Sequence, residues 1–289
     1  MTPHFADLLA DAIARRGSPA CVGLDPVLES LPPEARARHH DPLPAIGEFC
    51  RGVLAAVGDH APAVKFQAAC FERSGGRGVT LLEERGEHAR RLGLVVIYDA
   101  KRGDISTSAA HYAAAALRLH AHAVTLSGYM GASAVTPFLD AGLGVFVLVR
   151  TSNSDSDAIQ SQRLADGRSV GEMMADHVAA LGQERRGVGG LSDVGAVVGA
   201  TKSADAAALR RRMPDQVFLV PGYGAQGGSA EDIRAMLRPG RPAERAGVLV
   251  TASRSVIYAA PTAGESWQGE IENAAKKLAS ELKAICAGK

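Results

Sequence analysis

The stretch VVIYDAKRGDIS, residues 95–106, joins an apolar run to a cluster of charged side chains. Its first four residues are β-branched or aromatic, which is typical of a buried β-strand. The charges begin where the apolar run ends, at Asp99 and Lys101. Side chains two residues apart on a strand point to the same side, so we expect these two to share one face. The stretch therefore predicts a core strand that leads directly into a polar site.

Seven further apolar runs of similar length alternate with amphipathic helical patterns along the chain. Together with residues 94–101, the predicted strands are 19–25, 63–67, 121–127, 144–152, 193–201, 216–222 and 247–253. Their nearly continuous apolar character is typical of strands covered on both faces. Strict alternation of strand and helix predicts parallel strands joined by right-handed crossovers.

The number of repeats decides between the two common parallel α/β architectures. Eight strand–helix units follow one extra N-terminal helix, and no Gly-x-Gly-x-x-Gly motif follows the first strand. An open dinucleotide-binding sheet would be expected to carry that motif, whereas eight units are the number that closes a barrel. The sequence predicts an α/β fold, a (β/α)₈ TIM barrel with an extra N-terminal helix, formed by residues 1–289 as a single domain.

The composition excludes several classes of protein. The chain carries a net charge of +1 with 4% aromatic residues, which argues against a nucleic-acid partner. No apolar run approaches the roughly 18 residues that cross a bilayer, and the N-terminal segment is amphipathic, unlike a signal peptide. The four cysteines form no CxxC pair and indicate reduced thiols. We therefore expect a cytoplasmic protein with no membrane partner.

Polar side chains stand at the predicted carboxyl end of every strand. In a barrel these ends converge on one mouth, where the active site of this fold lies. The set comprises Asp25, Lys65, Gln67, Asp99, Lys101, Ser127, Ser152, Thr201, Gln226 and Arg254. Because buried charge is costly unless it is paired, these groups either neutralise one another or face a ligand. The histidines at 39–40 and at 120 and 122 lack a third ligand at suitable spacing, so no metal site is predicted.

Lys101 has the sequence context of a proton donor. Asp99 precedes it by two residues, and Asp104 follows just beyond the strand, within reach of the same ammonium. A lysine flanked by two carboxylates stays protonated, which suits a general acid better than a Schiff-base lysine. A structural ion-pair network that closes the barrel mouth is the alternative interpretation.

The loops after the seventh and eighth strands have the composition of a phosphate site. Residues 224–228 are rich in glycine, and Ser253 and Arg254 follow the eighth strand. Phosphate in this fold frequently binds at these two loops through backbone N–H groups and a cation. Glycine lets the backbone approach the anion, and arginine offers a planar fork of donors.

The motif that runs from Asp99 to Ile105, DAKRGDI, resembles the DxKxxDI signature of the orotidine 5'-phosphate decarboxylase family. The resemblance covers about residues 19–260. It includes Gly23-Leu24-Asp25, Lys65, Arg150-Thr-Ser152-Asn153, Pro221-Gly222-Tyr-Gly224-Ala-Gln226-Gly227 and Ser253-Arg254-Ser255. The length and the GYMG stretch at 128–131 are similar to a longer bacterial subfamily that includes mycobacterial enzymes. The chain departs from the family pattern at Ser108, at Ser127-Gly128 and at Ala252.

This resemblance implies decarboxylation of orotidine 5'-monophosphate to uridine 5'-monophosphate (UMP) without a metal or other cofactor. It implies that Lys101 protonates C6 beside Asp99. It further implies a homodimer with shared active sites, to which the partner subunit contributes Asp104, Ile105 and Ser108. The remaining roles that it implies are the ribose for Asp25 and Lys65, the pyrimidine edge for Ser152, and the phosphate for Gln226, Ser253 and Arg254.

Two other functions stay open on the residues alone. A sugar-phosphate lyase or isomerase of the same superfamily would use Mg²⁺ and an enediolate, and it would need an acid positioned as a metal ligand. A non-catalytic barrel that binds a phosphate ligand would be expected to have lost a member of the charged set, yet Asp25, Lys65, Asp99, Lys101 and Asp104 are all present.

Overall fold

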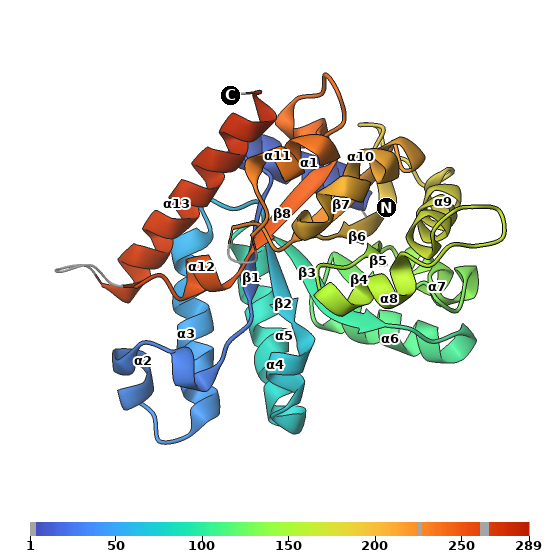
Figure 1. The fold of residues 1–289 in the computed structure, drawn as a ribbon. Helices are drawn as coiled ribbons and strands as arrows, with labels where there is room; N and C mark the ends of the chain where they lie inside the picture. The colour runs from blue at the N-terminus through green and yellow to red at the C-terminus, as the bar shows by residue number, and fades with distance from the viewer. Residues whose placement is uncertain (1–3, 225–226, 261–265, 289) are drawn as a thin grey trace.

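Eight parallel strands close into a barrel in the order of the sequence (Figure 1). The computed structural model describes residues 4–224, 227–260 and 266–288. The strands are β1 (Ala20–Leu24), β2 (Ala63–Gln67), β3 (Val95–Arg102), β4 (Ala123–Leu126), β5 (Gly144–Arg150), β6 (Ser192–Val198), β7 (Gln216–Pro221) and β8 (Val248–Ala252). Each lies on a predicted strand, with ends that differ by a few residues. The predicted TIM barrel is confirmed.

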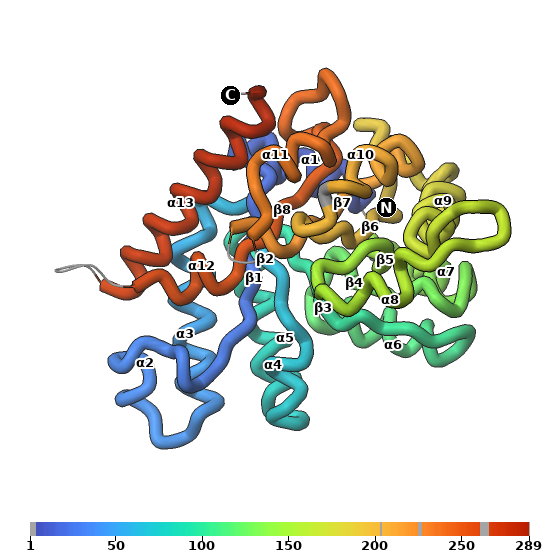
Figure 2. Tube along the Cα trace, in the orientation of Figure 1, coloured from blue at the N-terminus to red at the C-terminus, as the bar shows by residue number. Residues whose placement is uncertain are grey.

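Helices surround the barrel and connect consecutive strands. The longer ones are α1 (Phe5–Arg16), α3 (Pro42–Val57), α5 (Gly75–Arg91), α6 (Ser106–Arg118), α9 (Val170–Gly182), α10 (Ser203–Arg212), α11 (Ala230–Met236) and α13 (Trp267–Cys286). The short ones are α2 (Pro33–Ala37), α4 (Ala68–Glu72), α7 (Thr136–Asp140), α8 (Asp157–Gln160) and α12 (Arg254–Ile257). Five 3₁₀ turns complete the described elements: Leu28–Ser30, Ala132–Ala134, Ser154–Ser156, Ala200–Lys202 and Ala243–Arg245. The last helix, α13, packs beside α3, so the end of the barrel wall contacts its beginning (Figure 2).

Local sequence explains where several helices begin. Asp41 accepts a hydrogen bond from the backbone of Leu43 at the start of α3, and proline follows at the first helical position. Ser169 and Glu172 form a reciprocal capping box at the start of α9. These caps satisfy backbone N–H groups that have no partner within the helix.

The apolar core has two layers. The larger layer lies between the strands and the surrounding helices. The smaller one fills the barrel interior and is continued by α1, whose Phe5 ring meets the Phe146 ring edge-on at a centroid distance of 5.8 Å. Gly144 makes room for that contact, since a Cβ there would lie 2.2 Å from the Phe5 ring. The predicted N-terminal helix therefore packs into the interior from the end where the strands begin. No helix among the described residues is long and apolar enough to span a membrane.

Candidate active site

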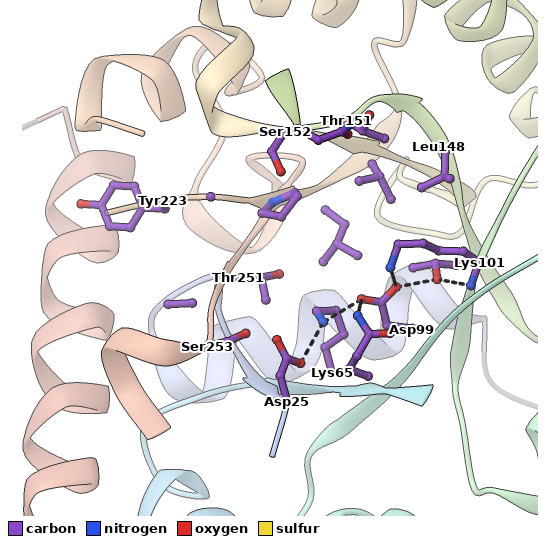
Figure 3. Close-up of a pocket in the computed structure, with 18 of the residues that line it drawn as sticks. Asp25, Lys65, Asp99, Lys101, Leu148, Thr151, Ser152, Tyr223, Thr251 and Ser253 are labelled. Atoms are coloured by element: carbon purple, nitrogen blue, oxygen red, sulfur yellow. Dashed lines mark hydrogen bonds and ion pairs between the residues drawn. The ribbon is translucent and has the colours of Figure 1, made fainter. Parts of the chain in front are cut away.

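A cavity of about 500 Å³ opens at the carboxyl ends of the strands (Figure 3). Its apolar wall comes from Leu148, Val197, Leu219 and Pro221. Its polar lining comprises Asp25, Lys65, Gln67, Asp99, Lys101, Thr125, Thr151, Ser152, Asn153, Gln160, Tyr223, Thr251, Ser253 and Arg254. Side chains on or next to all eight strands therefore meet in one space, as the barrel prediction required.

Asp99 lies at the centre of the charged groups. Its Oδ2 lies 2.7 Å from Nζ of Lys65 and 3.4 Å from Nε2 of Gln67, both on β2. Its Oδ1 accepts hydrogen bonds from Nζ of Lys101 at 2.7 Å and from the hydroxyl of Thr125 at 2.8 Å. An ionised carboxylate offers about four acceptor positions. The four donors therefore satisfy Asp99 as an anion although it is 6% exposed.

Charge coupling within this group explains the protonation states. Burial opposes ionisation of Asp99, but the ammonium groups of Lys65 and then Lys101 outweigh it and lower the pKa of Asp99 to about 2. Burial likewise opposes the charged form of Lys65, yet the carboxylates of Asp99 and Asp25 raise the pKa of Lys65 above its usual range. Both buried groups are therefore charged at neutral pH.

Asp25 extends this network to the first strand. Its Oδ1 lies 3.6 Å from Nζ of Lys65, a distance that gives an ion pair without a hydrogen bond. Among the described residues, this buried oxygen has no hydrogen-bond partner. Figure 3 shows Asp25 and Lys65 side by side on the cavity wall. Asp25 thus presents an unused acceptor next to a fixed cation.

A bulge in β3 sets the position of Lys101. Between the pairs Tyr98–Val124 and Arg102–Leu126, β3 advances by four residues while β4 advances by two. Lys101 lies within this bulge with φ at 48°, in the left-handed region that non-glycine residues rarely adopt. The side chain of Thr125 on β4 is 1% exposed and contacts the bulge. Thr125 was not predicted as a site residue, because Ser127 is the polar residue at the end of the predicted strand 121–127.

Ion pairs and hydrogen bonds fix the loop that follows β5. The Arg150 guanidinium is buried and pairs with Asp157 at 2.6 Å and with Asp205 at 2.7 Å. Gln160 holds Thr151 through two hydrogen bonds of 2.9 Å, one to its backbone N–H and one to its hydroxyl. Ser152 then lines the cavity, as predicted. The lack of a side chain at Gly199 allows this approach, since a Cβ there would lie 2.8 Å from Cα of Ser152.

The opposite side of the cavity is formed after β7 and β8. Gly222 and Gly224 have φ values of 92° and 69°, which explains why this turn requires glycine. Ser253 packs against the first strand, where a Cβ at Gly23 would lie 1.9 Å from Oγ of Ser253. Arg254 is exposed, and no carboxylate of the described residues pairs with it. The predicted Gln226 lies outside the described residues.

Asp104, Ile105 and Ser108 lie away from the cavity of their own chain. Spacing suggested that Asp104 would reach the ammonium of Lys101, and within one chain that interpretation is wrong. Among the described residues, Lys101 pairs with Asp99, while Oδ1 of Asp104 accepts a hydrogen bond from the backbone of Ile105 at 2.8 Å. Ile105 is 47% exposed, and Ser108 is also exposed, on α6. The bulge after Asp99 changes the direction of the chain that simple strand spacing assumed.

Metal sites in proteins are built from His, Cys, Asp or Glu side chains gathered around one point. Within residues 4–224, 227–260 and 266–288, no group of three or more His, Cys, Asp or Glu side chains is arranged to hold a metal ion. His122 is half-buried, and its Nδ1 accepts a hydrogen bond from the backbone N–H of Val96 at 2.9 Å. His39 pairs with Glu48 at 2.7 Å.

The closed barrel and its charged mouth define a (β/α)₈ protein with an enzyme-like site. Residues 18–268 match the orotidine 5'-phosphate decarboxylase / HUMPS family, and the chain belongs to that family. It is 39% identical to an orotidine 5'-phosphate decarboxylase of Rhodopirellula baltica over 96% of this chain and 99% of that protein. It is 41% identical to the Deinococcus radiodurans protein of the same name, over 90% and 91% of the two chains. The solved structure of Leishmania donovani OMP decarboxylase superposes with a TM-score of 0.78 at 36% identity, covering 99% of both chains.

Proposed function

We propose that this protein catalyses the decarboxylation of orotidine 5'-monophosphate to UMP and carbon dioxide, the last step of UMP synthesis. The observation that carries the proposal is the Lys65–Asp99–Lys101 group, held by hydrogen bonds of 2.7 Å at the mouth of a barrel of this family. Relatives at 39% and 41% identity over most of the chain bear the name of this activity.

The chemistry follows from the charged groups. The bond between C6 and the substrate carboxylate breaks, its electron pair stays on C6, and a proton moves from Nζ of Lys101 to C6 as carbon dioxide leaves. The pyrimidine ring delocalises this electron pair poorly, so electrostatic stabilisation by a fixed ammonium is the main contribution available. Asp99 fixes that ammonium through a hydrogen bond of 2.7 Å. The reaction as proposed uses no metal or organic cofactor.

Ligand contacts are assigned by the chemistry that each wall offers. Oδ1 of Asp25, which has no hydrogen-bond partner among the described residues, and the neighbouring ammonium of Lys65 suit the ribose hydroxyls. Ser152 on the anchored loop suits the pyrimidine edge. Arg254, which is exposed and lines the cavity, suits the phosphate together with Ser253 and Gln226. Binding energy from the phosphate can then contribute to positioning the ring.

We further propose that the enzyme is a homodimer with shared active sites. Asp104, Ile105 and Ser108 lie outside the cavity of their own chain, and Tyr112, which is 38% exposed, lies one helical turn after Ser108 on α6. Exposed apolar side chains of this kind are typical of an interface. In the dimer these residues would complete the site of the partner. We also propose that residues 1–289 act as one domain in the cytoplasm.

The activity can be tested by following the ultraviolet absorbance of orotidine 5'-monophosphate with purified protein and EDTA. We expect the absorbance change of conversion to UMP, with turnover unaffected by EDTA. No absorbance change would refute the proposal. Turnover of a sugar phosphate that depends on added Mg²⁺ would instead support the other branch of the superfamily.

A further inference from the structure

The side chain of Thr125 takes the place of a backbone partner in the β3 bulge. Regular pairing between β3 and β4 stops after Tyr98–Val124 and resumes at Arg102–Leu126. In that interval, the backbone N–H of Lys101 donates to Oγ1 of Thr125 at 3.0 Å. A bulge leaves an extra residue without its ladder partner. The Thr125 hydroxyl therefore satisfies an N–H group that the bulge would otherwise leave unpaired.

The same hydroxyl also binds the carboxylate beside the ammonium. Its O–H donates to Oδ1 of Asp99 at 2.8 Å, and Nζ of Lys101 donates to that same oxygen at 2.7 Å. Thr125 thus fixes the backbone of Lys101 through one bond and the carboxylate that orients the Lys101 ammonium through the other. Both contacts are short-range and directional, so neither a valine nor an alanine reproduces them.

The backbone of Lys101 needs such support. Its φ of 48° lies in a strained region for a residue with a side chain, and strain of this kind persists only when the surroundings hold it. Arg102, the next residue, is held by Glu72 and by the hydroxyl of Tyr98. Thr125 provides the corresponding restraint on the side of the bulge that faces the cavity.

We propose that Thr125 is a positioning residue for the decarboxylation, acting through Lys101 and Asp99. The inference rests on the proposed function. In this role the Thr125 hydroxyl orients the proton donor, Lys101, and contributes little to substrate affinity. This role adds a β4 residue to the charged group of Asp25, Lys65, Asp99 and Lys101, whose members lie on or directly after β1, β2 and β3.

The test compares Thr125→Val, which keeps the shape and removes the hydroxyl, with Thr125→Ser, which keeps the hydroxyl. We expect kcat of Thr125→Val to fall about 10- to 100-fold, since the bond to a charged group is lost, while KM changes by less than about threefold. Thr125→Ser is expected to retain kcat within about threefold. Thr125→Ala serves as a second variant without the hydroxyl should the valine variant fail to fold.

Ser192→Ala is a matched control. Ser192 is a buried residue at the start of β6, and its hydroxyl likewise donates one bond, to Gly182, and accepts one, from Val194, both at 3.1 Å. Removing it costs two buried hydrogen bonds at the opposite end of the barrel. We expect lower thermal stability with kcat unchanged.

If the wild-type protein is active, either of two outcomes would overturn the inference. One is wild-type kcat in the variant without the hydroxyl. The other is an equal loss of kcat in Thr125→Ser and in Thr125→Val. A wild-type protein that does not convert orotidine 5'-monophosphate refutes the proposed function itself, and the inference falls with it.

Discussion

Lys65 and Asp99 form a buried ion pair across neighbouring strands, with Nζ of Lys65 2.7 Å from Oδ2 of Asp99. Their positions follow from the register, because Lys65 lies opposite Ile97 and Gln67 lies opposite Asp99. Lys65 and Asp99 are each 6% exposed, so water solvates neither charge well. The other oxygen of Asp99, Oδ1, accepts a hydrogen bond from Nζ of Lys101. The Lys65–Asp99 pair therefore fixes the carboxylate that orients the proposed proton donor.

Replacing Lys101 by alanine should abolish turnover and preserve the fold. General acid catalysis typically contributes 10²- to 10⁴-fold, so we expect kcat/KM to fall by at least about 10²-fold. The side chain is 45% exposed, so its removal should change the thermal midpoint little. The measurement is the ultraviolet assay together with thermal unfolding. Lys277→Ala, an exposed lysine of α13, is the control, and near-full activity of Lys101→Ala would refute the assigned role.

Removing the charge of Asp99 should destabilise the protein in a pH-dependent way. The pKa of Asp99 is lowered to about 2 in the folded protein, from an ordinary value of 3.8. A lowered folded-state pKa stabilises the fold above the unfolded-state value, and this contribution is lost as the pH falls through the folded value. Asp99→Asn should therefore be less stable than wild type at pH 7, with a smaller difference at pH 3. Urea unfolding at both pH values measures it, and a difference that grows toward pH 3 would contradict the prediction.

Mixing two inactive variants should restore activity if the sites are shared. A dimer of Lys101→Ala with Asp104→Ala contains one site with both residues intact and one site with neither. Random exchange in an equal mixture makes half of the dimers hybrid, so we expect about a quarter of wild-type activity. Each variant alone is the control. Subunit exchange is monitored with two affinity tags, and exchange without recovered activity would argue against shared sites.

Arg254→Ala should weaken binding of the phosphate selectively. Loss of a charge-assisted bond reduces affinity by about 10- to 100-fold, so KM for orotidine 5'-monophosphate and the Kd for UMP should rise by that factor. Binding of uridine, which lacks the phosphate, should not change. Arg211→Ala, an exposed arginine of α10, is the control for general electrostatics. An equal loss of affinity for UMP and uridine would show that Arg254 does not recognise the phosphate.

Much of the architecture could be predicted from local pattern. The apolar runs that end in Asp25, Lys65 and Asp99 are strands because their residues favour extended, doubly covered backbone, and their number closes a barrel. Closure brings all carboxyl ends to one mouth. The meeting of residues far apart in sequence was therefore predictable without coordinates.

Other features depended on exact register. The bulge in β3 could not be read from the sequence, because Asp99-Ala-Lys101 fits a regular strand equally well. The role of Thr125 is visible only once β4 is aligned with that bulge. For the same reason, sequence spacing predicted that Asp104 would reach Lys101 of its own chain. In the folded chain, Oδ1 of Asp104 instead accepts a hydrogen bond from the backbone of Ile105.

The sequence by itself determined the barrel, the strand ends and the charged residues placed there, since periodicity and residue type are local properties. Only the tertiary structure decided which charges touch. Asp99 receives donors from β2, β3 and β4, and their distances of 2.7 to 3.4 Å depend on strand register and on the left-handed backbone of Lys101. Hydrogen bonds require placement within tenths of an ångström, and that precision arises from packing across strands.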